Sequence, residues 1–281
     1  MSTSSFAVEI SKIRAGVPEV LADSVAVEEP LEIRLSYSTP EGRATRSISI
    51  TMRTPGNDKE LAAGFLYTEA IISRSSDIAS IETCGPPAPD SGNHNVIRVD
   101  LATDVEVDLG RLQRHFYTTS SCGVCGKTSL DALRVGGASA MESPGQSFSR
   151  AVLTNVPDAL RAAQHTFDKT GGLHAAAAFN SEGDLIAVME DVGRHNAVDK
   201  VVGSLLLNNS LPANTLGLMV SGRASFELMQ KTLVAGIPLL AAVSAPSSLA
   251  VQLAQEFNMS LIGFLRGDSF NIYAVEERII E

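Results

Sequence analysis

Two closely spaced cysteines give this chain its clearest candidate for chemistry. Cys122 and Cys125 lie in the run SCGVCGK at residues 121–127, and Lys127 follows two positions after the second thiol. The glycines of this run let its backbone come close to an approaching molecule. A nearby ammonium favours the thiolate, which is the reactive form of a cysteine. The run therefore predicts a site of sulfur chemistry.

Several kinds of site are consistent with a C-x-x-C pair. A structural zinc site needs four ligands, so Cys84 and a histidine would have to complete it, and the sequence has no second metal-spaced pair. A redox disulfide is expected between a strand and the start of a helix, a context that is weak here. In a persulfide carrier, one thiolate would hold a sulfur atom and the second thiol would assist or resolve it. A pair of buried, inert thiols is disfavoured by the polar and glycine-rich flanks.

The sequence also contains an incomplete nucleobase deaminase pattern. His174 precedes Ala175 and Ala176, so an alanine stands where the H-x-E element has its glutamate. The cysteine pair comes before this histidine, which is the reverse of the deaminase order. We therefore expect a related scaffold without deaminase chemistry.

The composition narrows the class of protein. The chain has 281 residues, of which 44% are hydrophobic, and this suits one large or two modest domains with a sizeable core. The net charge of -10 argues against a broad nucleic-acid surface, which needs clustered Lys and Arg. Three cysteines do not make a disulfide framework, and residues 1–17 lack the apolar run of a signal peptide or membrane span. We expect a cytoplasmic protein that binds neither nucleic acid nor membrane.

The chain is expected to divide into four parts, whose boundaries follow changes in apolar periodicity and Gly- and Pro-rich stretches. They are an N-terminal arm at 1–20, a small α+β domain at 21–118, a mobile connector with the cysteine pair at 119–150, and an α/β cofactor-binding domain at 151–281.

The small domain is predicted to combine strands with one helix. Alternating apolar residues predict a β-hairpin within residues 31–52. Asn57 and Glu60 fit a capping box at the start of a helix. Residues 84–95 are typical of a loop, and residues 95–101 of a further strand.

The cofactor-binding domain is predicted to alternate helices with apolar strands, which favours a largely parallel sheet covered on both faces. The predicted helices are 157–169, 195–208, 224–235 and 247–257, and the predicted strands are 173–179, 185–192, 215–220, 238–243 and 260–265.

Four of the predicted strands end in small or charged residues, and ligands of open α/β sheets bind at such ends. A helix follows three of them directly, so free N–H groups and positive helix ends would face one crevice. Arg194, Arg223 and Arg266 in this crevice would suit an anionic ligand that carries phosphates. Asp268 or Asp191 is a candidate acceptor for the N–H edge of a purine. The alternative is that these loops only make turns and each arginine is a surface or ion-pair residue.

Six stretches of sequence carry a resemblance to a known family. They are TPGND at 54–58 with LAAGFL at 61–66, SCGVCGK at 121–127, GGLHAA at 171–176, DVGRHNAVDK at 191–200, SGRASFE at 221–227, and residues 263–271. From about residue 26 to its end, the chain resembles the FdhD/NarQ family of formate dehydrogenase accessory sulfurtransferases.

The resemblance implies a fold, a function and partners. The fold would be α/β, with a cytidine deaminase-like C-terminal domain containing a mostly parallel sheet, preceded by a smaller α+β domain. The protein would accept persulfide sulfur from a cysteine desulfurase. It would deliver this sulfur to the molybdenum bis-guanine-dinucleotide cofactor before that cofactor enters formate dehydrogenase. The alternatives are a non-catalytic chaperone that only binds the molybdenum cofactor and, from a different class, a zinc-dependent hydrolase.

The resemblance also implies roles for individual residues. Cys122 would be the persulfide carrier and Cys125 the assisting thiol, with no resident metal. GDP or another guanine nucleotide is expected to fit the cofactor site, and family members are expected to form homodimers. Together with the strand-end residues, the expected cofactor-binding set is Phe264, Leu265, Arg266, Gly267, Asp268, Ser269, Ser221, Gly222, Arg223 and Arg194.

Overall fold

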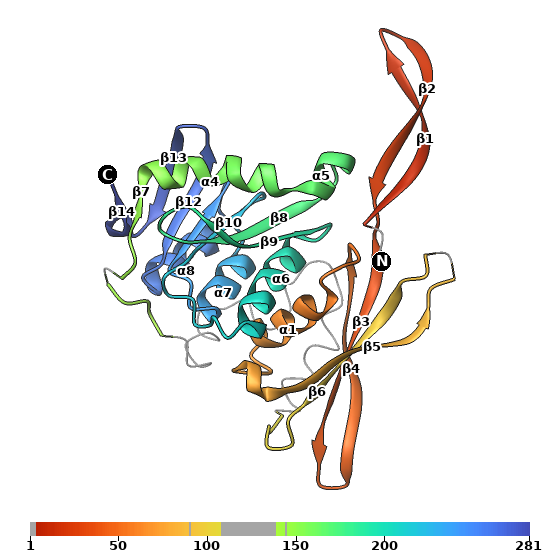
Figure 1. Ribbon diagram of the computed structural model, residues 1–281. Helices are drawn as coiled ribbons and strands as arrows, with labels where there is room; N and C mark the ends of the chain where they lie inside the picture. Colours follow the sequence, from red (N-terminus) through yellow and green to blue (C-terminus); the bar gives the residue numbers. More distant parts are fainter. Residues whose placement is uncertain (1–3, 90, 108–138, 144) are drawn as a thin grey trace.

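The computed structural model describes residues 4–89, 91–107, 139–143 and 145–281. Cys122, Cys125 and Lys127 therefore lie outside the described residues, as does most of the predicted connector. Within the described ranges, the chain forms two larger sheets, of four and six strands, and a two-stranded ribbon that projects from them (Figure 1).

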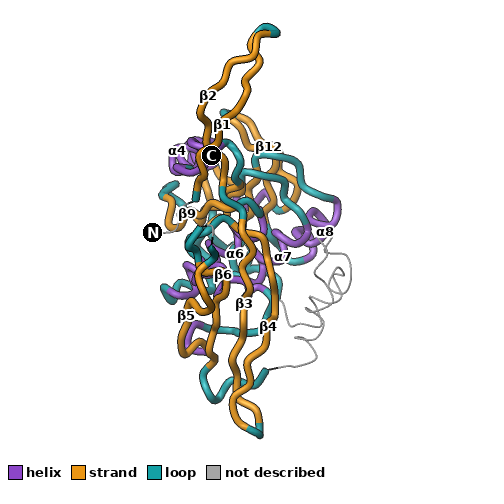
Figure 2. Tube along the Cα trace, turned by 90° about the vertical axis from the view of Figure 1, so that its right-hand side faces the viewer, coloured by secondary structure: helices purple, strands orange, loops and turns teal. Residues whose placement is uncertain are grey.

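The ribbon pairs β1 (Ser5–Arg14) with β2 (Val17–Ala26) in antiparallel register. Its two-residue turn has positive φ at both central positions, 48° at Ala15 and 82° at Gly16, which matches the twist of a hairpin. The sequence predicts a loosely held arm at residues 1–20, whereas the structure has this ribbon. The ribbon and the hairpin of the four-stranded sheet extend from opposite ends of the molecule (Figure 2).

The four-stranded sheet has the order β4-β3-β6-β5 and is covered by one long helix. Its strands are β3 (Glu29–Thr39), β4 (Gly42–Arg53), β5 (Ile78–Pro87) and β6 (His94–Leu101), with α1 (Asp58–Thr68) and the short 3-10 helix η1 (Ser75–Asp77) between β4 and β5. The predicted β3–β4 hairpin is confirmed, with Leu31, Ile33 and Leu35 fully buried beneath α1.

Two local predictions in this domain are wrong. Asn57 precedes α1 in a left-handed conformation, with φ of 55°, and its side chain caps no N–H group, so the capping box does not form. Strand β5 also takes the first part of the predicted loop at 84–95, because it pairs with β6 as far as Pro87.

The six-stranded sheet has the order β13-β12-β11-β10-β8-β9. Its strands are β8 (His174–Phe179), β9 (Leu185–Asp191), β10 (Gly217–Val220), β11 (Leu239–Ala242), β12 (Ser260–Arg266) and β13 (Ser269–Ala274). Only β10–β11 and β11–β12 are parallel among its pairings, so the predicted mostly parallel sheet is wrong and the sheet is mixed. The reason is that short turns join β8 to β9 and β12 to β13, and a short turn permits only antiparallel pairing.

Helices cover both faces of this sheet (Figure 1). The helices are α4 (Arg150–Ala163), α5 (His165–Thr170), α6 (Arg194–Leu207), α7 (Phe226–Val234) and α8 (Ser248–Glu256). Strand β7 (Phe148–Ser149), just before α4, pairs with β14 (Ile279–Ile280), which follows the 3-10 helix η2 (Glu276–Arg278). Leu160 of α4 packs with Met219 on one face, whereas Val201 of α6 and Leu228 of α7 pack with Leu218 on the other. The single helix predicted at 157–169 is wrong: the structure has two helices here, α4 and α5, with Gln164 between them.

The two larger sheets are joined through a close crossing of α1 and α6. A Cβ atom added at Gly64 would collide with the backbone carbonyl of Asp199, and one added at Gly203 would collide with the carbonyl of Glu60. Only glycine permits this approach of two helix backbones. The crossing fixes the small domain against the side of the six-stranded sheet that carries α6.

Candidate functional site

A cavity of about 620 Å³ lies where the carboxyl ends of β10, β11 and β12 meet α4 and α5. Its lining residues are Pro157, Asp158, Leu160, Arg161, Gln164, Phe167, Gly171, Gly172, Leu173, His174, Ser221, Val243, Leu265, Arg266 and Gly267. This volume lies within the range of small-molecule sites. The position agrees with the rule that α/β sheets bind ligands at strand ends.

The cavity brings together only part of the predicted cofactor-binding set. Ser221, Leu265, Arg266 and Gly267 line it. The predicted residues that are not among its lining are Arg194, Gly222, Arg223, Phe264, Asp268 and Ser269. The helices that begin near Arg194 and Arg223 pack on the face of the sheet opposite α4, so those two arginines approach the strand ends from the other layer.

The end of β12 has an irregular backbone that shapes one wall. Phe264 has a φ of 53°, which is uncommon for a residue with a side chain, and its register with β13 is shifted. Its N–H donates to the carbonyl of Ser244, 3.2 Å away. The Nε of Arg266 donates to the carbonyl of Val243 at 3.1 Å, and its guanidinium lies 6.0 Å from the Phe264 ring centre. Arg266 is thus oriented by contacts on both sides.

Ser221, on the same strand-end wall, is bonded to the start of β8. Its N–H donates to the carbonyl of Ala175 at 2.9 Å, and its Oγ accepts from the N–H of Ala175 at 2.9 Å. The hydroxyl hydrogen of Ser221 remains available to a ligand, because a hydroxyl can donate as well as accept.

The α4–α5 wall contains residues that the sequence reasoning missed. The guanidinium of Arg161 lies 4.7 Å from the ring centre of Phe167, and Gln164 lines the cavity although only 4% of it is exposed. Pro157, Arg161 and Gln164 recur at helical spacing. That spacing was the signal in the sequence, but by itself it did not distinguish a ligand-facing stripe from a core-facing one.

A second pocket, of about 470 Å³, lies on the far side of Leu173. It is lined by Ser4, Thr54, Pro55, Gly56, Asn57, Ala163, His165, Thr166, Leu173, Val188, Met189, Glu190 and Lys200. The carboxylate of Glu190 accepts from the N–H groups of Thr166 and Phe167 at 2.9 and 2.7 Å, so it holds the start of α5 in place.

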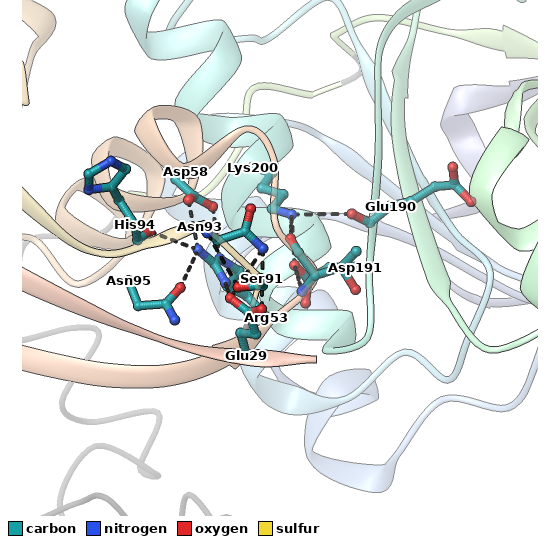
Figure 3. Close-up of polar contacts among 11 residues, drawn as sticks. Glu29, Arg53, Asp58, Ser91, Asn93, His94, Asn95, Glu190, Asp191 and Lys200 are labelled. Atoms are coloured by element: carbon teal, nitrogen blue, oxygen red, sulfur yellow. Dashed lines mark hydrogen bonds and ion pairs between the residues drawn. The ribbon is translucent and has the colours of Figure 1, made fainter. Parts of the chain in front are cut away.

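Asp191 and Lys200 form a buried ion pair beside this second pocket (Figure 3). Their charged atoms are 2.7 Å apart, and Asp191 is fully buried. The carboxylate of Asp191 also accepts from Thr54 N–H, Gly193 N–H and the amide of Asn196. The prediction that Asp191 reads a purine edge is therefore wrong, because its oxygens are committed to protein donors. Asp268 is exposed at the turn after β12, and its role stays a prediction.

The neighbouring Arg53 belongs to a second charged cluster (Figure 3). Its Nε and Nη2 donate to the carboxylate of Asp58 at 3.0 and 2.9 Å, and Nη2 also donates to Asn95. Glu29 lies 3.7 Å from Nη1. This cluster joins β4 to the start of α1, so the TPGND stretch is held between two buried networks.

A third buried pair links α6 to α7. Lys231 lies 2.9 and 3.0 Å from the carboxylate oxygens of Asp199, and Thr68 of α1 donates to the same carboxylate at 2.8 Å. Burial raises the pKa of Asp199 to about 6, against the opposing effect of Lys231. Although burial disfavours its charge, Lys231 has a raised pKa because of the neighbouring carboxylate.

Two histidines lie near Arg194 at the ends of β8 and β9. Burial, followed by the charge of Arg194, lowers the pKa of His195 to about 3. The same two causes lower the pKa of His174. Glu227 lies 3.4 Å from His195 Nε2, but its side chain is 43% exposed, and the nearby cations outweigh it. Both imidazoles are therefore neutral at pH 7.

In the described part of the chain, no three His, Cys, Asp or Glu side chains are grouped to hold a metal ion. None of the helices in the described ranges combines the length and apolar character needed to cross a bilayer.

The fold and the cavity together define a mixed α/β protein with a cavity of small-molecule size at the strand ends. A family model described as the FdhD/NarQ family matches residues 26–280. The chain belongs to the FdhD/NarQ family.

Relatives with assigned names cover nearly the whole chain. "Sulfur carrier protein FdhD" of Streptomyces avermitilis is 50% identical over 273 residues, covering 96% of this chain and 94% of the relative. The protein of the same name from Sulfurisphaera tokodaii is 44% identical and covers 97% and 98%. The crystal structure of a candidate formate dehydrogenase accessory protein from Desulfotalea psychrophila superposes with a TM-score of 0.76 at 25% identity, covering 99% of this chain and 100% of that one.

Proposed function

We propose that this chain is a sulfur carrier for formate dehydrogenase. It would accept sulfur on Cys122 and deliver it to a molybdenum bis-guanine-dinucleotide cofactor. The observation that carries the proposal is the strand-end cavity, lined by Ser221, Arg266 and Gly267, in a chain whose relatives are named sulfur carriers. The cysteines themselves lie outside the described residues.

The proposed loading step transfers one sulfane sulfur. The Cys122 thiolate attacks the terminal sulfur of a persulfide on a cysteine desulfurase. The donor's S–S bond breaks, its cysteine leaves as a thiolate with the bonding electrons, and a persulfide forms on Cys122. No net oxidation occurs, because one S–S bond replaces another.

The proposed delivery step needs two electrons, which the second cysteine supplies. The Cys125 thiolate attacks the Sγ of Cys122, the persulfide S–S bond breaks, and the terminal sulfur leaves as sulfide toward the cofactor. A Cys122–Cys125 disulfide remains, and a dithiol reductant of the cytoplasm then restores both thiols. A spacing of two intervening residues suits such a pair.

The cavity supports the cofactor part of this proposal. Its volume of about 620 Å³ suits one nucleotide, and Arg266 supplies a fixed positive charge for a diphosphate. A cofactor with two guanine-dinucleotide arms extends beyond one such cavity. A homodimer that offers one cavity to each arm meets this requirement.

The test is the intact mass of the purified protein after incubation with a cysteine desulfurase and cysteine. We expect an added sulfur of about 32 Da on the wild type and on Cys84→Ala, but none on Cys122→Ala. The Cys122→Ala variant should also abolish activation of formate dehydrogenase while its circular dichroism is unchanged. An equal sulfur adduct on Cys122→Ala would overturn the assignment of the carrier. No adduct on any of the proteins would favour the non-catalytic cofactor chaperone.

A further inference from the structure

The side-chain amide of Gln164 has no role in the contacts described so far. This residue ends α4, is only 4% exposed, and lines the strand-end cavity. No described residue hydrogen-bonds to its amide, although its backbone N–H donates to Arg161. Buried amides are usually hydrogen-bonded, so an amide in a cavity wall with no partner among the described residues can pair with a ligand that enters the cavity.

Gln164 contributes to the wall of the strand-end cavity. The fully enclosed polar atoms without a partner in the described residues belong to Arg53, Arg194, His195 and Arg278, and the Gln164 amide is not among them. Gln164 nevertheless lines the cavity, although only 4% of the residue is exposed.

Near Gln164, the guanidinium of Arg161 packs against the ring of Phe167 and pairs with the carboxylate of Asp168. Arg161 lies 4.7 Å from the ring centre of Phe167, and both residues line the same cavity. A guanidinium plane and an aromatic ring are the groups on which planar heterocycles stack. Hence the α4–α5 wall combines a stacking surface with an amide that can pair with an edge.

The opposite wall has a different chemistry. Arg266 and Gly267 lie at the end of β12, and Ser221 adds a hydroxyl hydrogen. These groups suit phosphate oxygens rather than a base. The two walls therefore orient a nucleotide, with its base toward α4–α5 and its phosphates toward the end of β12.

We infer that Gln164 reads the edge of the heterocycle of the bound cofactor, pairing with its ring carbonyl and the adjacent ring N–H. This inference rests on the proposed function. A carboxamide places a donor and an acceptor side by side, and guanine presents the complementary acceptor and donor at O6 and N1–H. The pterin ring has the same edge, so the shared chemistry is a 2-amino-4-oxopyrimidine.

The experiment measures binding of three probes to the full-length protein by calorimetry. The probes are GDP, ribose 5-diphosphate, which lacks the base, and 6-hydroxymethylpterin. The variants are Gln164→Leu, which has no amide, and Gln164→Glu, which keeps the size and loses the donor. The control is Gln252→Leu, because Gln252 is exposed on α8, across the sheet from α4.

We expect Gln164→Leu to weaken GDP binding about tenfold to a hundredfold, the usual worth of a bidentate base contact. Binding of ribose 5-diphosphate should change less than about twofold, which also shows that the variant is folded. Gln164→Glu should fall between Gln164→Leu and the wild type. Loss of pterin binding rather than GDP binding would support the same edge contact and identify the pterin as its source.

Equal affinities of the wild type and both Gln164 variants for GDP and for the pterin would overturn the inference while leaving the proposed function intact. A wild-type protein that binds ribose 5-diphosphate and GDP equally would show that no base is read, which also overturns it. A wild-type protein that binds none of the probes would overturn the guanine-dinucleotide client in the proposed function, and the inference with it.

Discussion

Two polar regions of the described chain use their hydrogen-bonding groups in opposite ways. Around α6, Asp191 and Lys200 are fully buried and each contacts several protein groups. In the strand-end cavity, Gln164 is only 4% exposed, and its amide has no hydrogen-bond partner among the described residues. Burial with complete pairing is typical of a structural role, whereas burial with unused capacity beside open space is typical of ligand binding.

This difference indicates that the stretch DVGRHNAVDK has a mainly structural role. Asp191, Asn196, Asp199 and Lys200 within it connect α6 to β4, α1 and α7. A motif rich in charged residues at a strand end looks like a ligand site in sequence. Here most of its polar groups hold two domains together, and the cavity lies on the other face of the sheet.

The largest expected effect comes from breaking the buried ion pair. Asp191→Ala leaves the ammonium of Lys200 buried without its carboxylate, so the free energy of unfolding should fall by about 3–5 kcal/mol. Denaturant titration measures this loss. Asp104→Ala, in an exposed turn, is the control and should stay within about 0.5 kcal/mol of the wild type. If Asp191→Ala matched Asp104→Ala, the pair would not be structural and the comparison between the two regions would fail.

Substitutions in the cavity should affect binding instead of stability. Arg266→Ala should weaken GDP binding about tenfold, because it removes a charged contact to phosphate. Arg223→Ala should weaken it less, since Arg223 does not line the cavity. Titration of GDP into each variant checks this order, and Arg46→Ala on exposed β4 is the control. Unchanged affinity in both Arg266→Ala and Arg223→Ala would remove the crevice as the nucleotide site.

The smallest expected effect is a pH dependence from His195. Its pKa is lowered in the fold from 6.5 to about 3, so the unfolded chain binds a proton first as the pH falls. The contribution of neutral His195 to the free energy of unfolding is therefore complete above pH 6.5, and it is lost progressively as the pH falls toward 3. Between pH 7 and 5 the loss should be about 1 kcal/mol, a value reduced because 32% of the side chain is exposed.

His195→Gln provides the comparison for this pH effect. Its unfolding free energy should depend less on pH between 7 and 5 than that of the wild type. Gln252→Leu, on the exposed side of α8, removes no titratable group and should keep the wild-type dependence. Identical pH profiles for wild type and His195→Gln would show that His195 is solvated in the folded protein.

Local patterns predicted most elements but not the sheet that they form. The helices at α6, α7 and α8 and the strands β8 to β12 follow from apolar periodicity, since each segment has one pattern over its whole length. Short turns make the β8–β9 and β12–β13 pairings antiparallel, whereas the antiparallel pairing of β8 with β10 depends on how the chain returns in space. The ribbon β1–β2 escaped prediction because its strands carry polar residues on both faces.

The sequence by itself determined the family, the reactive cysteine pair as a hypothesis, and the strand ends as the place for a ligand. Only the tertiary structure decided which polar residues near those ends are free. The carboxylate of Asp191 is paired with Lys200, Thr54 and Asn196, none of which is its neighbour in the sequence. The Gln164 amide has no partner in the described part of the chain, and the residue lines a cavity at the end of α4. Hydrogen-bond partners come from chain packing, and a linear pattern does not contain them.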